Sequence, residues 1–337
     1  MSPPTAPPQG QAGILPVAIG GPEPVGETLA ILGCGIMGTA ILLGVLSAQS
    51  SRSKSDGANL LPSRFRACVR RPESAESIRA QLPSQTLEST VVLHTNDNVS
   101  AIRQADVVLL ACQPHLFKPV LEEPGMAAAL KGKLIMSVLA GVTSEDIEDH
   151  LESVAARDEQ AKDACNGAFS VVRVMPNIAC AVQASSTVLE VRPPQHPRPL
   201  SEHFVATAHA IFSCVGAVHK TSPDTFAIGT TLNGSTPAFF AMVIDGLVDG
   251  AVALGLSRKE ATQMAAATMS GTADLILKGK STQDLRYEVA CPGGSTIQGI
   301  RTLEEARTRA VWMDAMRAST SEQSGLGDGL KVQRKAA

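Results

Sequence analysis

The chain lacks an excess of charge of either sign, and this absence excludes one large class of partners. Its 337 residues carry a formal net charge of -3, with acidic and basic residues interspersed along the length. A protein that binds nucleic acid needs a basic face to neutralise phosphates. The sequence holds no such concentration of lysine and arginine, so we expect no nucleic-acid partner.

Paired cysteines and clustered histidines are lacking as well. No C-x-x-C pair and no histidine at zinc-finger spacing occurs, and the seven cysteines stand far apart, at positions 34, 68, 112, 165, 180, 214 and 291. An odd number of scattered thiols is typical of a reduced intracellular protein. The seven histidines are equally dispersed, so the pattern predicts no metal site.

Basic residues are missing from the N-terminus, where none precedes Arg52. A signal or transit peptide needs that positive charge. Residues 1–26 are instead rich in proline and glycine, a composition typical of disorder. We expect a disordered tail over residues 1–26 and a cytoplasmic protein.

Hydrophobic residues, by contrast, make up 44% of the chain, which is enough for a core in each of two domains. An apolar run leads into the hexapeptide G-C-G-I-M-G at residues 33–38, and an apolar helical pattern follows it. In this context Gly33 suits the tight turn, Gly35 the close approach of a pyrophosphate, and Gly38 the packing of helix on strand. The motif predicts a dinucleotide site; the alternative is a glycine turn that serves packing alone.

The next predicted strand, Phe65 to Val69, ends in Arg70 and Arg71. An NAD site usually places an acidic residue here to hold the ribose hydroxyls. Two guanidinium groups suit the 2′-phosphate of NADP instead. We therefore expect NADPH as the cofactor, with NADH as the alternative, and a basic strand end that only faces water as the structural alternative.

Further apolar runs continue the pattern of strands alternating with helical segments, at residues 91–93, 105–112, 134–139 and 171–175. The run 105–112 stops at Gln113-Pro114-His115, a natural point for the backbone to meet a cofactor at the carboxyl end of a sheet. After the run 134–139, Thr143 is expected to cap a helix with Asp146. Such alternation predicts a Rossmann fold, a doubly wound and mostly parallel sheet.

After Lys220 the strand pattern gives way to helical segments. Residues 225–244 carry no charge, but polar residues at 233–237 interrupt them, so we expect a helix buried between protein surfaces rather than a membrane span. Further helices are predicted at 259–277, 285–290 and 298–319. The first helix is apolar nearly all round, which predicts a homodimer or larger assembly. We place the nucleotide domain at 27–220, an all-helical dimerisation and substrate domain at 221–327, and a disordered tail at 328–337.

The stretch Y-E-V-A-C-P-G-G-S-T-I-Q-G-I at residues 287–300 combines helix-stopping and flexible residues with hydroxyls. Pro292 ends a preceding helix, and Gly293 and Gly294 let backbone approach a ligand. The first free N–H groups of the next helix then suit an anion. The alternative is an ordinary turn whose helix is capped by Ser295 or Thr296.

Together these segments resemble the pyrroline-5-carboxylate reductase family from about Leu29 to Gly327. The resemblance is carried by L-G-C-G-I-M-G, A-C-Q-P-H, L-A-G-V-T, R-V-M-P-N, L-N-G-S-T-P-A, I-D-G-L-V-D-G-A-V-A-L-G-L and E-V-A-C-P-G-G-S-T-I. It implies an NAD(P)H domain, a helical dimerisation domain, an active site between them and often a ring of dimers. The implied substrate is a cyclic imine carboxylate, reduced to proline by hydride transfer to the imine carbon.

The resemblance also implies site residues. The substrate carboxylate would lie against the backbone of Gly294, Ser295 and Thr296, and the Thr296 hydroxyl would bond the imine nitrogen as the catalytic group. Asn233, Ser235 and Cys291 complete the expected substrate site. The cofactor would contact Gly33, Cys34, Gly35, Ile36, Met37, Gly38, Arg70, Arg71, Asn96, Ala111, Cys112, Gln113, Pro114, Ala140 and Gly141.

Departures from the family's pattern gather at the substrate end. Cys291 replaces a common serine, Asn233 and Thr236 add bulk to a segment that often reads S-G-S-G-P, and Gln113 replaces a common lysine. They are consistent with a related imine, such as a methylated pyrroline or a six-membered piperideine carboxylate, or with an unchanged substrate.

Two further readings stay open at the level of sequence. A β-hydroxyacid dehydrogenase would want a catalytic lysine early in the second domain, and none lies between Thr221 and Arg258. A catalytically impaired cofactor-binding paralogue is the other reading. The intact residues Gly33, Gly35, Gly38 and Thr296 argue against it.

Overall fold

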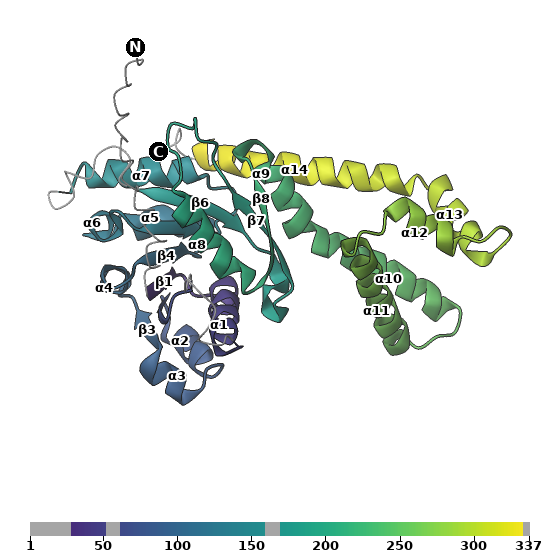
Figure 1. The fold of residues 1–337 in the computed structure, drawn as a ribbon, viewed down its shortest axis with the longest axis horizontal. Coiled ribbons are helices and arrows are strands. Elements are labelled where there is room, and N and C mark those ends of the chain that lie inside the picture. Colours follow the sequence, from purple (N-terminus) through teal and green to yellow (C-terminus); the bar gives the residue numbers. More distant parts are fainter. Residues whose placement is uncertain (1–27, 52–60, 159–168, 333–337) are drawn as a thin grey trace, which may run out of the picture.

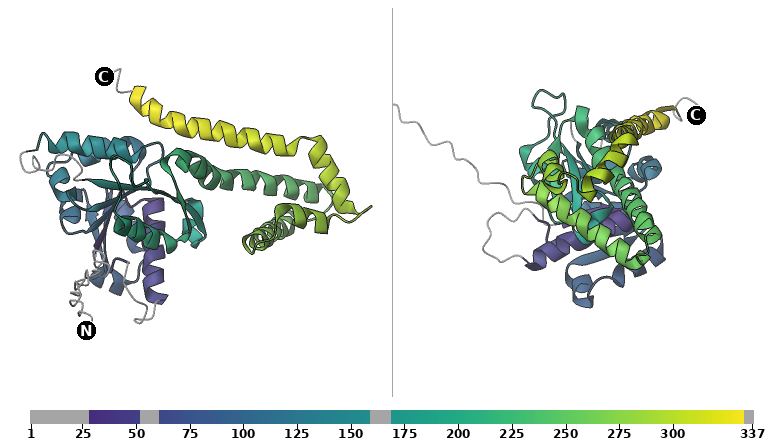
Figure 2. Two further views of the ribbon diagram at one scale, coloured as in Figure 1. Left: turned by 45° about the horizontal axis from the view of Figure 1, so that its top comes forward. Right: turned by 90° about the vertical axis from the view of Figure 1, so that its right-hand side faces the viewer.

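The computed structural model describes residues 28–51, 61–158 and 169–332, so the tail predicted at residues 1–26 lies outside them. A layered α/β body holds the first part of the described chain, and an arm of helices extends from it (Figure 1). The final helix returns along the arm toward the body (Figure 2).

One eight-stranded sheet forms the centre of the body, in the order β3-β2-β1-β4-β5-β6-β7-β8. Neighbouring strands are parallel except for β6 and β7. The predicted doubly wound, mostly parallel sheet is therefore confirmed. Its strands are β1 (Thr28–Leu32), β2 (Arg64–Val69), β3 (Val91–Thr95), β4 (Val107–Leu110), β5 (Leu134–Ser137), β6 (Ser170–Met175), β7 (Ser185–Glu190) and β8 (Gly216–Thr221).

Helices cover both faces of the sheet, and the alternation of side chains along β1 shows how. Leu29 and Ile31 belong to a buried cluster on one face, whereas Ala30 and Leu32 belong to a cluster on the other. A strand that is buried on both faces must be apolar throughout, which is why the sequence marks it so clearly. The helices of the body are α1 (Ile36–Ser51), α2 (Pro72–Arg79), α3 (Ser84–Ser89), α4 (Asn98–Arg103), η1 (Pro114–Leu116), α5 (Phe117–Leu121), α6 (Met126–Leu130), α7 (Ser144–Ala155), η2 (Ile178–Val182) and α8 (Glu202–Ser213).

The predicted cap at Thr143 is confirmed. Its hydroxyl accepts a hydrogen bond from the Asp146 N–H at 3.0 Å, and the Thr143 N–H donates to the Asp146 carboxylate at 3.2 Å. This reciprocal pair starts α7 directly after the turn at Gly141, whose φ of 72° is left-handed. The turn is thereby fixed at the carboxyl end of β5.

The arm begins directly after β8 and contains a π-helix. Its helices are α9 (Pro223–Thr230), the π-helix η3 (Thr231–Ser235), α10 (Thr236–Ala253), α11 (Arg258–Leu277), α12 (Thr282–Val289), α13 (Ser295–Glu305) and α14 (Thr308–Val332). The described residues after β8 form no further strand, as the sequence predicts. The division between the domains at residue 220 remains a prediction.

Two predicted limits in the arm are corrected. The helix expected over residues 298–319 is two helices, because Arg307 adopts a left-handed φ of 54° between α13 and α14. Residues 328–332, expected in a disordered tail, are helical, since α14 continues to Val332. Extending a formed helix adds one hydrogen bond per residue. The glycines near the end of α14, each of which destabilises a helix by about 1 kcal/mol relative to alanine, therefore do not end it. Residues 333–337 lie outside the described residues.

The arm exposes much of its apolar surface in the single chain. Large side chains such as Met242 and Leu247 are 69% and 60% exposed. By length and composition alone, the continuous helix Pro223–Ala253 is long and apolar enough to cross a membrane, and 11% of its most apolar stretch is buried. An apolar face of this extent marks a surface that another partner covers.

Candidate active site

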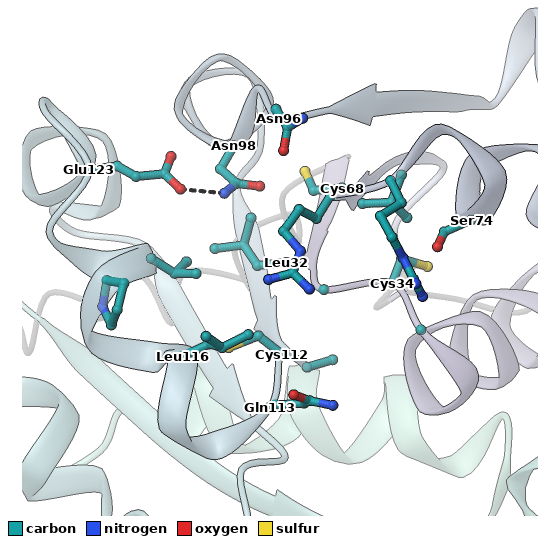
Figure 3. Close-up of a pocket in the computed structure, with 18 residues that line it drawn as sticks. Leu32, Cys34, Cys68, Ser74, Asn96, Asn98, Cys112, Gln113, Leu116 and Glu123 are labelled. Carbon is teal, nitrogen blue, oxygen red and sulfur yellow. Dashed lines mark hydrogen bonds between the residues drawn. The ribbon is translucent and has the colours of Figure 1, made fainter.

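A cavity of about 460 Å³ opens at the carboxyl ends of β1, β2 and β4, with Asn96 just past β3 at its edge (Figure 3). This is the edge of a parallel sheet where ligands bind. Many of the predicted cofactor residues line it: Gly33, Cys34, Gly35, Arg70, Arg71, Asn96, Ala111, Cys112 and Gln113. Residues that reach it from distant parts of the sequence are thus brought together by the sheet.

The glycine turn after β1 has the geometry that the motif requires. Gly33 has a φ of 81°, and a Cβ there would lie 2.6 Å from the Cys112 Cα. A Cβ on Gly38 would lie 3.0 Å from the Ile31 side chain, so this glycine lets α1 pack on β1. At Gly35 the nearest atom of the described chain would be 4.0 Å away. Gly35 therefore leaves open space where the turn meets the cavity.

The end of β2 supplies positive charge to one side of the cavity. Arg70 and Arg71 are both exposed and line it, as does Ser74 of α2. Arg71 stands at the start of α2, where the helix dipole also favours an anion. The arrangement fits a phosphate beside the ribose, and contact with the 2′-phosphate stays a prediction.

Residues beyond β3 and β4 form the opposite wall. The Asn98 side-chain amide donates to the Glu123 carboxylate at 2.6 Å, and both residues line the cavity, with Asn96 beside Asn98 (Figure 3). Sequence reasoning missed Ser74, Asn98 and Glu123. The position of Asn98 just after a strand was the one available signal, because strand ends meet at this edge.

Several predicted cofactor residues lie outside the cavity wall. Ile36, 89% exposed, lines a neighbouring hollow between α1 and α2. Ala140 packs against the buried residues Met175, Val188 and Phe226. Met37, Gly38, Pro114 and Gly141 are likewise absent from the lining. Their contact with a cofactor remains a prediction.

Three thiols border the cavity, and burial keeps them protonated. Desolvation raises the pKa of Cys34 and of Cys112 from 9.0 to about 11, and that of Cys68 to about 12. A thiol attacks as its thiolate. These cysteines are therefore inert at neutral pH and serve as small apolar wall residues.

The predicted substrate loop connects α12 to α13 and is shaped by its glycines. Gly293 has a φ of 72°, and the Gly294 N–H donates to the Cys291 carbonyl at 3.0 Å. α13 begins at Ser295 with Gly294 as its N-cap, and within this described segment no side chain caps it. The alternative of a turn capped by Ser295 or Thr296 is therefore wrong, since both residues lie inside the helix. The first N–H groups of α13 are left available for an anion.

The side chain of Asn233 forms hydrogen bonds at the junction between the arm and the sheet. It is 6% exposed, and its side-chain amide donates to the Met175 and Ser186 carbonyls at 2.6 and 2.7 Å. The Asn177 amide in turn donates to the Asn233 carbonyl at 3.1 Å. Both donor hydrogens of Asn233 are thus used, and any contact with substrate is left to its oxygen.

The predicted substrate and cofactor groups lie far apart in a single chain. α13 is at the outer end of the arm, whereas the cavity is in the α/β body (Figures 1 and 2). The helix start that suits a carboxylate cannot serve the cavity of its own subunit in this arrangement. The predicted contact of Ser295 and Thr296 with a substrate in this cavity remains a prediction.

Two models of known protein families match the sequence. The one described as pyrroline-5-carboxylate reductase dimerisation covers residues 223–326, from the start of α9 into α14. The one described as NADP oxidoreductase, coenzyme F420-dependent, covers residues 28–141, from β1 to the turn after β5. The first match covers the arm whose apolar surface is exposed, and so supports self-association through it.

Related proteins extend the match over most of the chain. The Delta-1-pyrroline-5-carboxylate reductase kk1I of Curvularia clavata is 41% identical over 317 residues, 89% of this chain and 96% of the relative. A pyrroline-5-carboxylate reductase of Lophium arboricola is 41% identical over 312 residues, 90% of this chain and 94% of the relative.

Solved structures share the two-part architecture. A pyrroline-5-carboxylate reductase from Coxiella burnetii matches with a TM-score of 0.71 at 26% identity, over 90% of this chain and 98% of that one. The Plasmodium falciparum pyrroline carboxylate reductase, solved with NADP bound, shares the fold with a TM-score of 0.68 at 21% identity, over 89% and 98% of the two chains. Fold, cavity and relatives together place this chain in the pyrroline-5-carboxylate reductase family.

Proposed function

We propose that this protein reduces the cyclic imine 1-pyrroline-5-carboxylate to proline, with NADPH as the reductant. The observation that carries the proposal is the pairing of two anion sites within this family: a glycine turn beside two arginines, and an uncapped helix start beside Thr296. The first suits a phosphorylated dinucleotide, and the second suits a small carboxylate. The protein is an oxidoreductase that acts on a carbon–nitrogen bond.

Reduction of the imine requires the protein mainly to position the substrate against the cofactor. NADPH, when bound, would supply the hydride, and the imine reacts with its nitrogen already protonated, so that hydride addition to the carbon yields the amine without a proton from the protein. The N–H groups at the start of α13 hold the substrate carboxylate, and the Thr296 hydroxyl hydrogen-bonds the imine nitrogen. Holding the reacting carbon about 3 to 3.5 Å from the donor provides most of the acceleration. This mechanism uses no strong base, in accord with protonated thiols around the cavity.

A partner subunit completes each site in this proposal. The exposed apolar surface of α10 and α11 pairs with its copy, and the outer end of one arm then reaches the cavity of the other subunit. An isologous pair of this kind contains two equivalent sites. We further propose that the protein is cytoplasmic, that the helix Pro223–Ala253 is covered by the partner rather than by a membrane, and that dimers associate into a ring.

A second candidate substrate is a related imine, such as a ring-substituted pyrroline or a piperideine carboxylate. Cys291 favours it, because this residue stands exposed at the α13 turn where the family commonly has a serine. A thiol is a weaker hydrogen-bond donor than a hydroxyl. The site then relies more on the backbone of α13 and less on this side chain.

The test is a panel of synthetic cyclic imine carboxylates with purified protein and NADPH, followed by the loss of NADPH absorbance and by identification of the amino acid formed. We expect turnover of 1-pyrroline-5-carboxylate and formation of proline. Preference for a substituted or six-membered ring would select the second candidate. Absence of turnover with every imine, despite NADPH binding, would overturn the reductase assignment and leave an impaired cofactor-binding paralogue.

A further inference from the structure

The junction between the α/β body and the arm is built around one buried ring. Phe226 of α9 is 1% exposed and packs on Met175 of β6 and Val188 of β7, together with Ala140 from the turn after β5. The ring therefore touches both the sheet and the turn that closes β5. It is the buried aromatic contact by which the start of the arm rests on the body.

Arg173 extends this contact through the antiparallel pairing of β6 with β7. Val174 is paired with Leu189 and Met175 with Val188, which places Arg173 opposite Glu190. Because side chains alternate along a strand, Arg173 lies on the same face as Met175. Its guanidinium carbon is 4.1 Å from the centre of the Phe226 ring.

An ion pair with Glu190 also holds the guanidinium in place. Arg173 donates to one Glu190 oxygen at 3.2 Å, and Ser144 donates to the other at 2.7 Å. The Glu190 side chain is 1% exposed and that of Arg173 is 13% exposed. Ser144 is the first residue of α7. A continuous set of contacts thus runs from the start of α7 through Glu190 and Arg173 to the arm.

The length of the arm makes the junction angle important. α10 alone has 18 residues, or about 27 Å of helix. A rotation of about 5° at the junction moves a point that far away by about 2 Å. Misplacement by about 1 Å in an active site can cost about 100-fold in rate. When two arms pair, this angle sets where each body stands against the α13 of the partner.

We propose that Arg173 is a positioning residue for the reaction. By lying over the Phe226 ring while paired with Glu190, it fixes the angle between body and arm, and so the separation between the cofactor cavity and the partner's α13. This inference rests on the proposed function for its kinetic consequence. Its structural consequence, the placement of the arm, can be measured without turnover.

Kinetic variants separate the contact between the guanidinium and the Phe226 ring from the effect of the positive charge alone. Arg173→Lys keeps the ion pair with Glu190 but loses the flat guanidinium, and Phe226→Leu loses the ring. We expect each to lower kcat at least 10-fold with the dissociation constant of NADPH unchanged, and the double variant to be no worse than either single one. Phe226→Tyr keeps the ring and should retain kcat. Arg198→Lys is the matched control, because Arg198 pairs with Asp149 and Glu152 on α7 and should leave kcat unchanged.

A second measurement uses the single tryptophan. Trp312 lies on α14 with its ring 6.4 Å from that of Phe239 on α10, so it moves with the arm. Energy transfer from Trp312 to bound NADPH should change in Arg173→Lys and stay constant in Arg198→Lys. A lower melting temperature with unchanged kcat and unchanged transfer would overturn the inference, since Arg173 would then serve stability alone. If wild-type protein reduces no imine, the proposed function fails, while energy transfer still decides the role of Arg173.

Discussion

Shared active sites can be tested by combining two subunits that are impaired in different parts of the site. The first variant is Gly35→Asp: the structure leaves room for a Cβ at Gly35, with the nearest atom 4.0 Å away, so the chain should fold. Its carboxylate would repel the pyrophosphate from the glycine turn. The second variant is Thr296→Ala, which removes the hydroxyl at the start of α13 and leaves the cavity intact.

The expected activities follow from the arrangement of the arms. Loss of a hydrogen bond to a charged group costs about 1.5 to 3 kcal/mol, so the activity of Thr296→Ala should fall about 10- to 150-fold. In a heterodimer, one site combines an intact cavity with an intact α13, and the other site carries both defects. The heterodimer should therefore show about half of the wild-type activity, since one of two equivalent sites works.

The assay uses co-expression of the two variants with different affinity tags and purification over both columns. NADPH oxidation with 1-pyrroline-5-carboxylate is then compared among the heterodimer and the two parent homodimers. Activity of the heterodimer equal to the mean of its parents would refute a shared site. It would mean that each chain uses its own α13, in conflict with the separation seen in Figure 1.

Three further outcomes are expected. Thr296→Ser, which keeps the hydroxyl, should recover most of the activity lost in Thr296→Ala; equal loss in both would remove the hydroxyl from the mechanism. Replacing Arg70 and Arg71 together by Ser should raise KM for NADPH at least 10-fold more than KM for NADH, and parallel changes would exclude them as 2′-phosphate ligands. Burial holds the folded pKa of Cys34 at about 11 and of Cys68 at about 12, above the ordinary 9.0, so the folded state retains protons that the unfolded chain loses. Below pH 9 the ionisation of these thiols should not change the free energy of unfolding. Above pH 9 the free energy of unfolding should fall by about 1.4 kcal/mol per thiol for each pH unit, up to about pH 11. Denaturant titrations at several pH values should show that the free energy of unfolding of Cys68→Ala falls less steeply with pH than that of the wild type. An unchanged dependence on pH would contradict the raised pKa of Cys68.

Much of the body could be predicted because its signals are local. A strand buried on both faces must be an apolar run, and β4 and β5 read as such in the sequence. Gly33 and Gly38 are needed because backbone and side chains approach where a Cβ would stand. Thr143 and Asp146 satisfy the first N–H groups of α7 within three residues of each other.

Other features depended on contacts that local sequence does not encode. Nothing near Asn98 predicts that its amide meets Glu123, because 25 residues separate them and only the sheet brings them together. Asn233 is expected at the substrate, yet the carbonyls of Met175 and Ser186 take both of its amide hydrogens. The break at Arg307 was missed because helical periodicity continues on both sides of it.

The sequence by itself determined the family, the doubly wound sheet and the glycine turn with its two arginines. Each depends on residues close together in the chain, or on motifs short enough to read directly. Only the tertiary structure decided that the cofactor cavity and α13 lie at opposite ends of one subunit, that no side chain caps the start of α13, and that Arg173 lies over the Phe226 ring between body and arm. A few buried contacts orient the long helices of the arm. These contacts join residues that are far apart in the sequence, so local sequence patterns do not predict them.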